Sequence, residues 1–264
     1  MSEHHQTSNP TRAPMPTVRK ISASDIYACL KLGVRDFRDA PLFGLVIGAL
    51  VAGIGLAIFL GLTILDLPWM AYPFAIGFPL VGPFAAVVLY AVSRNLEQGQ
   101  EPNWKNVLAV VWAQRGRELS FMAFVMLFVF WVWMYQIRLL IALCLGLVSF
   151  ASFDEFLTVV FTTTNGWVFL GAGHIVGAAL ALILYSITVI SMPLLLEREI
   201  DIVTAMITSV KTVIESPFIM LGWGIIVTLS VMIACLPFFA GLLFILPILG
   251  HTTWHIYRKA VVPA

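Results

Sequence analysis

Residues 42–64 of this 264-residue chain read LFGLVIGALVAGIGLAIFLGLTI, a run that contains no Asp, Glu, Lys or Arg. The hydrocarbon core of a bilayer is about 30 Å thick, and about 20 residues of helix cross it with their backbone hydrogen bonds made internally. The run therefore predicts a transmembrane helix. Comparable apolar segments predict five more, at residues 71–93, 119–147, 167–193, 218–236 and 238–256.

The composition of the whole chain is typical of a helical membrane protein. Hydrophobic residues make up 60% and charged residues 11%, against about 45–50% and about 25% in soluble domains. The chain has 15 Lys and Arg and 14 Asp and Glu, so it lacks the basic excess that a nucleic-acid partner would require. We expect an all-α membrane protein whose main partner is the lipid bilayer, with no nucleic-acid partner.

The distribution of positive charge predicts the orientation of the six spans. Short loops rich in Lys and Arg stay in the cytoplasm, and with six spans every Lys and Arg except Arg138 falls on the side of the two termini. Both termini are therefore expected in the cytoplasm. Residues 1–20 are polar, contain prolines and predict a disordered cytoplasmic tail. Residues 21–264 predict a single polytopic membrane domain.

Three segments that face the cytoplasm in this topology have helical amphipathic patterns, at residues 22–39, 103–117 and 201–216. Asp25 precedes Pro41 by sixteen residues and Asp201 precedes Pro217 by sixteen, and an apolar span follows each proline. The pattern predicts a unit repeated three times, in which an amphipathic helix precedes a transmembrane hairpin. Such helices either lie in the headgroup region or pack on the inner end of the bundle.

If the amphipathic helices lie in the headgroup region, their basic residues are candidates for contact with anionic lipid headgroups. These candidates are Lys31, Arg35, Arg38, Lys105, Arg115 and Arg117.

Polar residues within or beside the spans are candidates for a site, because ionisable groups in membranes are often functional. Arg138 and His174 lie in the third and fourth spans, and Asn165 lies just before the fourth. We expect Arg138 near the outer face, where Asp154 or Glu155 could pair with it. Pro79 and Pro83 predict a kink inside the second span, although broken helices also build transporter sites.

His251 and His255 are four residues apart, so they share one face of the last helix. Two histidines could contribute to a metal site, but the sequence places no third ligand beside them. Their position before Tyr257 and Arg258 favours interfacial anchoring of the helix end over metal or haem binding.

The sequence contains no GxSxG elbow, no P-loop, no HExxH motif and no pair of carboxylates within a span. We therefore expect no enzymatic activity, no catalytic residues, and no metal or cofactor.

Two groups of short motifs carry a resemblance to a known family. They are Phe78-Pro79-Leu80-Val81-Gly82-Pro83, Leu89-Tyr90, Ser93-Arg94, Leu96-Glu97, Ser191–Arg198, Asp201, Thr204-Ala205-Met206, Ser209-Val210, Gly250-His251 and Trp254–Arg258. Across about residues 17–262 the chain resembles an uncharacterised bacterial membrane-protein family, domain of unknown function 2189. The resemblance implies a multi-pass protein of the bacterial inner membrane and brings no established site residues.

The leading hypothesis is a non-enzymatic scaffold, accessory subunit or assembly factor, possible partners being other inner-membrane complexes. One alternative is a small-solute transporter or channel, which would need a polar cavity. The other is a lipid-binding or lipid-handling protein, which would use the amphipathic helices and their basic residues.

Overall fold

The computed structural model describes residues 15–64, 77–114, 118–146, 150 and 153–262. Within them the secondary structure is helical, apart from an isolated β-bridge between Val18 and Val261. The long helices are α2 (Pro41–Ile64), α4 (Val81–Glu97), α6 (Glu118–Cys144), α8 (Thr164–Thr188), α11 (Pro217–Cys235) and α12 (Leu242–Ala260). The shorter helices are α1 (Ala23–Asp39), α5 (Trp104–Gln114), α7 (Phe153–Thr162), α9 (Ser191–Glu197) and α10 (Ile202–Glu215). A 3-10 turn, η2 (Phe78–Leu80), precedes α4.

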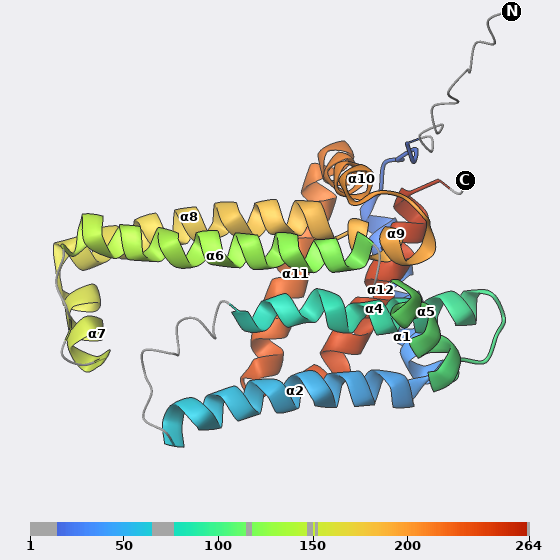
Figure 1. The fold of residues 1–264 in the computed structure, drawn as a ribbon, viewed down its shortest axis with the longest axis horizontal. Coiled ribbons are helices and arrows are strands. Elements are labelled where there is room, and N and C mark those ends of the chain that lie inside the picture. Colours follow the sequence, from blue (N-terminus) through green and yellow to red (C-terminus); the bar gives the residue numbers. More distant parts are fainter. Residues whose placement is uncertain (1–14, 65–76, 115–117, 147–149, 151–152, 263–264) are drawn as a thin grey trace, which may run out of the picture.

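Figure 1 shows the arrangement of these helices. α2, α4, α6 and α8 run along the long axis of the molecule, while α11 and α12 cross them steeply. α1, α5, α9 and the C-terminal end of α12 gather toward the right-hand end of the view, and α7 lies at the opposite end. The all-α fold expected from the sequence is confirmed.

Within the described residues, five helical segments are long and apolar enough to cross a membrane, where six were expected. They are Pro41–Ile64, Phe78–Glu97, Glu118–Cys144, Thr164–Glu197 and Pro217–Cys235. The expected span at residues 238–256 corresponds to α12, which is not one of the five. The C-terminal half of α12 carries Thr, His and Arg side chains, which lower its hydropathy, and this half is surrounded by protein.

The boundaries of the other spans follow the sequence with small shifts. The described part of the second runs from Phe78 to Glu97, so it ends four residues later than expected, and residues 71–76 of the expected span lie outside the described residues. The third, α6, is one unbroken helix of 27 residues.

The three amphipathic segments form helices α1, α5 and α10, as predicted. α1 and α10 end at corners with nearly the same backbone angles: Ala40 has φ −135° and ψ 56°, and Ser216 has φ −139° and ψ 59°. A proline that opens the next long helix follows each corner. The helix–corner–span unit expected from the spacing of Pro41 and Pro217 is therefore present twice in the backbone.

The N-terminal ends of these helices are capped by polar side chains, which satisfy backbone N–H groups that have no partner inside the helix. Ser22 and Asp25 form a capping box at the start of α1, and the Asp201 carboxylate accepts a hydrogen bond from the Thr204 N–H at 2.9 Å. The Asn103 side chain accepts from the Asn106 N–H at 2.8 Å. The repeated unit thus begins with a capped helix in each case.

The predicted disordered segment 1–20 is ordered at its C-terminal end. The Val262 N–H donates to the Thr17 carbonyl and the Arg19 N–H donates to the Ala260 carbonyl, each at 2.9 Å. Residues 1–14 lie outside the described residues. The two ends of the described chain are therefore joined beside the C-terminal end of α12.

Glycines allow α1 and α2 to approach α12 closely. A Cβ atom added at Gly48 would lie 2.7 Å from the Leu243 Cα atom, and one at Gly33 would lie 2.7 Å from the Thr252 backbone nitrogen. Real Cβ atoms do not come this close to backbone atoms. Gly44 and Gly48 thus serve helix packing within the chain, whereas nothing lies within 4 Å of a Cβ added at Gly173.

Candidate functional site

The largest concentration of buried polar groups surrounds the C-terminal half of α12. His251, Thr252, Thr253 and His255 are all less than 9% exposed. Helices α1, α4 and α9 contact α12 in this part of the fold. Buried polar side chains are costly unless they are hydrogen-bonded, so the partners of these groups define the site.

Asp36 of α1 and His255 of α12 form a buried pair. His255 Nε2 lies 2.7 Å from Asp36 Oδ2, and the two side chains are 8% and 1% exposed. Burial by itself would raise the pKa of Asp36, but the hydrogen bond and charge of His255, with a contribution from Ser93, hold that pKa below its ordinary value. Asp36 is therefore a carboxylate, and His255 Nε2–H donates to it.

A second polar pair joins α4 to α12 next to the first. Ser93 Oγ lies 2.7 Å from His251 Nδ1, and both residues are fully buried. His251 Nε2 is buried as well and has no hydrogen-bond partner among the described residues. Because Ser93 also lowers the pKa of Asp36, the two pairs form one network across α1, α4 and α12.

Two glutamates connect the end of α12 to α4 and α9. Glu97 accepts hydrogen bonds from Trp254 Nε1 at 3.1 Å and from Arg258 Nε at 3.0 Å. Glu197 accepts from Arg258 Nη1 at 2.8 Å and from the Tyr257 hydroxyl. Arg258 thus bridges two carboxylates from separate helices, which fixes α12 between them.

The expected interfacial position of His251 and His255 is corrected by this arrangement, because both side chains face the protein interior. The described residues contain no group of three or more His, Cys, Asp or Glu that could hold a metal ion. Asp36 and Ser93 were not identified from the sequence as site residues. A polar residue on the buried face of an amphipathic helix could have been recognised from the sequence. Which face is buried, however, depends on the neighbour against which the helix packs.

The other polar candidates do not join this network. Arg138 on α6 and Asn165 and His174 on α8 are exposed. His174 Nδ1 lies 2.7 Å from the Leu170 carbonyl oxygen, one turn earlier in the same helix. These three residues therefore belong to the outer surface of the α6–α8 pair.

Pro79 and Pro83 lie where 3-10 geometry changes to α-helical geometry. Pro79 lies in η2 and Pro83 in the first turn of α4, which begins at Val81. A proline is tolerated in the first turn because its missing N–H would have no partner there. Gly77, directly before η2, is also helical, and residues 71–76 lie outside the described residues, so the kink expected inside the second span stays a prediction.

α1 presents a cationic face opposite its buried face. Tyr27, Lys31, Arg35 and Arg38 are exposed, and Lys31 Nζ lies 4.5 Å from the centre of the Tyr27 ring. The buried face is centred on Cys29, Gly33 and Asp36, whereas the larger apolar residues of the helix, Ile26, Leu30, Val34 and Phe37, are only partly buried. Because α12 approaches α1 closely at Gly33, the face of α1 that carries the small residues turns toward α12. Lys105 is also exposed, and Arg115 and Arg117 lie outside the described residues.

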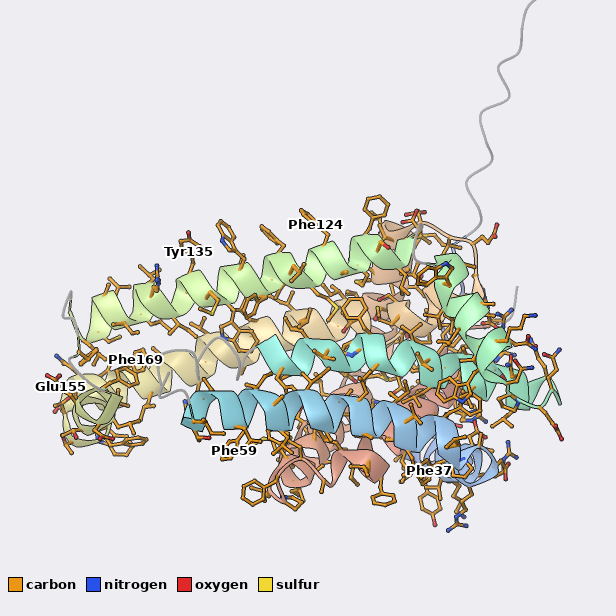
Figure 2. The ribbon with its side chains drawn as sticks, turned by 60° about the horizontal axis from the view of Figure 1, so that its bottom comes forward. Phe37, Phe59, Phe124, Tyr135, Glu155 and Phe169 are labelled. Atoms are coloured by element: carbon orange, nitrogen blue, oxygen red, sulfur yellow. The ribbon has the colours of Figure 1, made fainter. Side chains whose placement is uncertain are left out.

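α6 carries an exposed row of aromatic side chains. Its members are Phe121, Phe124, Phe128, Trp131 and Tyr135, with exposed fractions from 55% to 72%. Figure 2 shows Phe124 and Tyr135 pointing away from the other helices along one edge of the molecule. We call these five residues the α6 aromatic row.

Comparison with known proteins identifies one relationship. Residues 71–197 match the model of a family described as "Predicted integral membrane protein", domain of unknown function 2189. No curated protein and no solved structure matches the chain. The matched region includes Ser93, Glu97 and Glu197, which bind α12. Residues 71–197 of this multi-pass integral membrane protein therefore match the domain of unknown function 2189 family.

Proposed function

We propose that the protein is a non-enzymatic scaffold, accessory subunit or assembly factor that binds a transmembrane helix of another membrane protein through the α6 aromatic row. The row carries this proposal because of its spacing. Its members follow one another at intervals of three, four, three and four residues. That alternation places side chains along a single seam of a helix, as in helix pairs that pack knobs into holes.

The chemistry of the row supports a protein partner more than lipid. Trp131 and Tyr135 pack against each other with ring centres 4.6 Å apart, and neither polar atom has a hydrogen-bond partner among the described residues. At about 1.5 Å per residue, Trp131 lies about 20 Å along α6 from Glu118, within the thickness of the hydrocarbon core. A Trp N–H at that depth is stabilised by an acceptor, which a neighbouring helix can supply.

In the proposed orientation, the end of the bundle that carries α1, α5 and α10 faces the cytoplasm, and α12 is the sixth helix that crosses the membrane. Arg138 lies about 30 Å along α6 from Glu118, one hydrocarbon thickness away. Glu118 accepts a hydrogen bond from the Ile202 N–H at the start of α10. The spacing of Glu118 and Arg138, and the contact of Glu118 with α10, support a cytoplasmic edge of the hydrocarbon core near Glu118 and a periplasmic edge near Arg138. The membrane proposed is the bacterial inner membrane.

Lipid handling is the second candidate, and the cationic face of α1 favours it. Lys31, Arg35 and Arg38 are exposed beside the start of α2, where anionic headgroups would lie. The transporter alternative has weaker support, because Arg138, Asn165 and His174 are exposed on the outside of the α6–α8 pair.

Site-specific photocrosslinking in native membranes tests the scaffold proposal. A benzophenone amino acid is placed at Phe124 or Trp131, and a matched control is placed at Leu229, which is 52% exposed on α11. We expect one discrete adduct with a second protein from the α6 positions and none from Leu229. The same partner should co-purify in mild detergent with the unmodified chain and be lost from a Phe124→Ala, Trp131→Ala double variant.

Two results would contradict the proposal. Equal labelling of α6 and α11, with lipid adducts alone, would show that the α6 aromatic row faces the bilayer. An adduct with twice the mass of the chain would show that a second copy of this protein covers it.

A further inference from the structure

A cavity opens where the first two spans meet the inner end of the molecule. Its volume is about 520 Å³, and it is lined at the α1–α2 corner by Asp39, Leu42 and Phe43 and at the end of α4 by Leu96 and Glu101. α2 begins at Pro41 and α4 ends at Glu97. The cavity therefore lies at the level where two transmembrane helices leave the hydrocarbon core and lipid headgroups begin.

The lining of this cavity combines two carboxylates with apolar side chains. Asp39 and Glu101 supply carboxylates, while Leu42, Phe43 and Leu96 supply apolar surface. The Asp39 carboxylate is 53% exposed and has a long contact of 3.9 Å with Arg35 Nε. Glu101 is exposed and has no ion-pair partner within the described part of the chain. Both carboxylates are thus available to a cationic group.

An apolar track continues from the cavity along α2. Leu42, Val46, Leu50 and Ile54 follow one another at four-residue intervals and are 60%, 44%, 59% and 36% exposed. At about 1.5 Å per residue the track is about 18 Å long, which is close to one leaflet of a hydrocarbon core about 30 Å thick. An acyl chain extending from a headgroup in the cavity would lie along this track.

We propose that the cavity lined by Asp39 and Glu101 binds the headgroup of an aminophospholipid, with its primary ammonium on the two carboxylates and an acyl chain along Leu42, Val46 and Leu50. The site involves no residue of α6, so it goes beyond the scaffold proposal and does not depend on it.

The charges near the cavity select this class of lipid. A primary ammonium donates three hydrogen bonds, and bonds between ionised partners are the stronger ones. An anionic lipid without an amine would place its negative charge beside two carboxylates. Arg38 directly precedes the lining residue Asp39, and Lys105 follows the lining residue Pro102 by three positions. Both are exposed, so the phosphate of an aminophospholipid has cationic neighbours. A choline headgroup has no N–H to donate, which makes it a poorer ligand.

Native mass spectrometry of the delipidated full chain in mild detergent tests the site. The ligands are short-chain phosphatidylethanolamine, phosphatidylglycerol and phosphatidylcholine, together with free phosphorylethanolamine as the soluble source of the same headgroup. We expect one phosphatidylethanolamine to bind with a Kd at least about tenfold lower than that of each of the other three ligands, since a hydrogen bond to a charged group changes affinity by about that factor.

Two variants separate binding from folding. Asp39→Asn with Glu101→Gln should reduce phosphatidylethanolamine binding about tenfold or more, and Gln100→Trp, at an exposed lining position, should reduce it by filling the cavity. Asp154→Asn, at the far end of the molecule on α7, is the matched control and should bind normally. Circular dichroism confirms that each variant is helical.

Each contrary result overturns the proposal. Equal binding of phosphatidylglycerol would show that the carboxylates do not select the headgroup. If free phosphorylethanolamine bound as tightly as phosphatidylethanolamine, the apolar track along α2 would contribute nothing to binding. Unchanged binding in both the carboxylate variant and Gln100→Trp would place the lipid elsewhere.

Discussion

Replacement of Gly48 by alanine is expected to lower the free energy of unfolding by about 1–3 kcal/mol, the usual effect of inserting a methyl group into a closely packed core. The new Cβ would lie 2.7 Å from the Leu243 Cα atom and 2.8 Å from the Leu242 carbonyl oxygen. Both are backbone atoms, so α2 and α12 must separate. Gly48→Ile is expected to prevent assembly of the folded bundle.

Gly53→Ala is the matched control for this effect. Gly53 lies in the same helix, and nothing lies within 4 Å of a Cβ added there. The measurement is the midpoint of thermal unfolding in mild detergent, followed by size-exclusion chromatography of the heated protein. Equal midpoints for the Gly48 and Gly53 variants would show that α2 and α12 are farther apart than described.

Loss of the Asp36 carboxylate is expected to have the larger effect. Asp36→Ala leaves His255 buried without its partner at 2.7 Å, and breaking a buried charged pair on one side costs about 3–5 kcal/mol. We expect α1 to lose protection from hydrogen exchange together with the last turns of α12. Asp154→Ala removes an exposed carboxylate on α7 and should leave stability and exchange unchanged. Normal protection of α1 in Asp36→Ala would contradict the assigned role.

Acid should destabilise α1 in the native protein as the Asp36→Ala substitution does, because it protonates the Asp36 carboxylate. The pKa of Asp36 is lowered in the folded state, although burial alone would raise it, because of the hydrogen bond and charge of His255, with smaller contributions from Ser93 and His251. An unfolded aspartate has a pKa of about 3.9. The stabilisation is therefore complete above about pH 4 and is lost as the pH falls through the folded pKa. Hydrogen exchange of α1 between pH 6 and pH 3 measures this loss, which should be absent from Asp36→Ala.

The helical content and most of the spans could be predicted from the sequence, because the cost of unpaired backbone groups in hydrocarbon leaves long apolar segments few alternatives. Local signals also located the capped helices α1 and α10 and the prolines that follow them. The predicted first span, residues 42–64, and the observed helix α2, Pro41–Ile64, therefore differ by one residue. The same hydropathy argument did not reveal that the polar half of α12 is surrounded by protein.

The candidate site depended on contacts between residues far apart in the sequence. Asp36 and His255 are separated by 219 residues and Ser93 and His251 by 158, and no local pattern specifies such pairs. The rotation of α1 that buries Asp36 follows from the close packing of Gly33 against Thr252. The sequence by itself determined a multi-helix membrane protein with capped amphipathic helices, because those features follow from local hydrophobicity and backbone hydrogen bonding. Only the tertiary structure decided which polar residues share the interior of α1, α4 and α12, because helix rotation and neighbour choice are set by packing between distant segments.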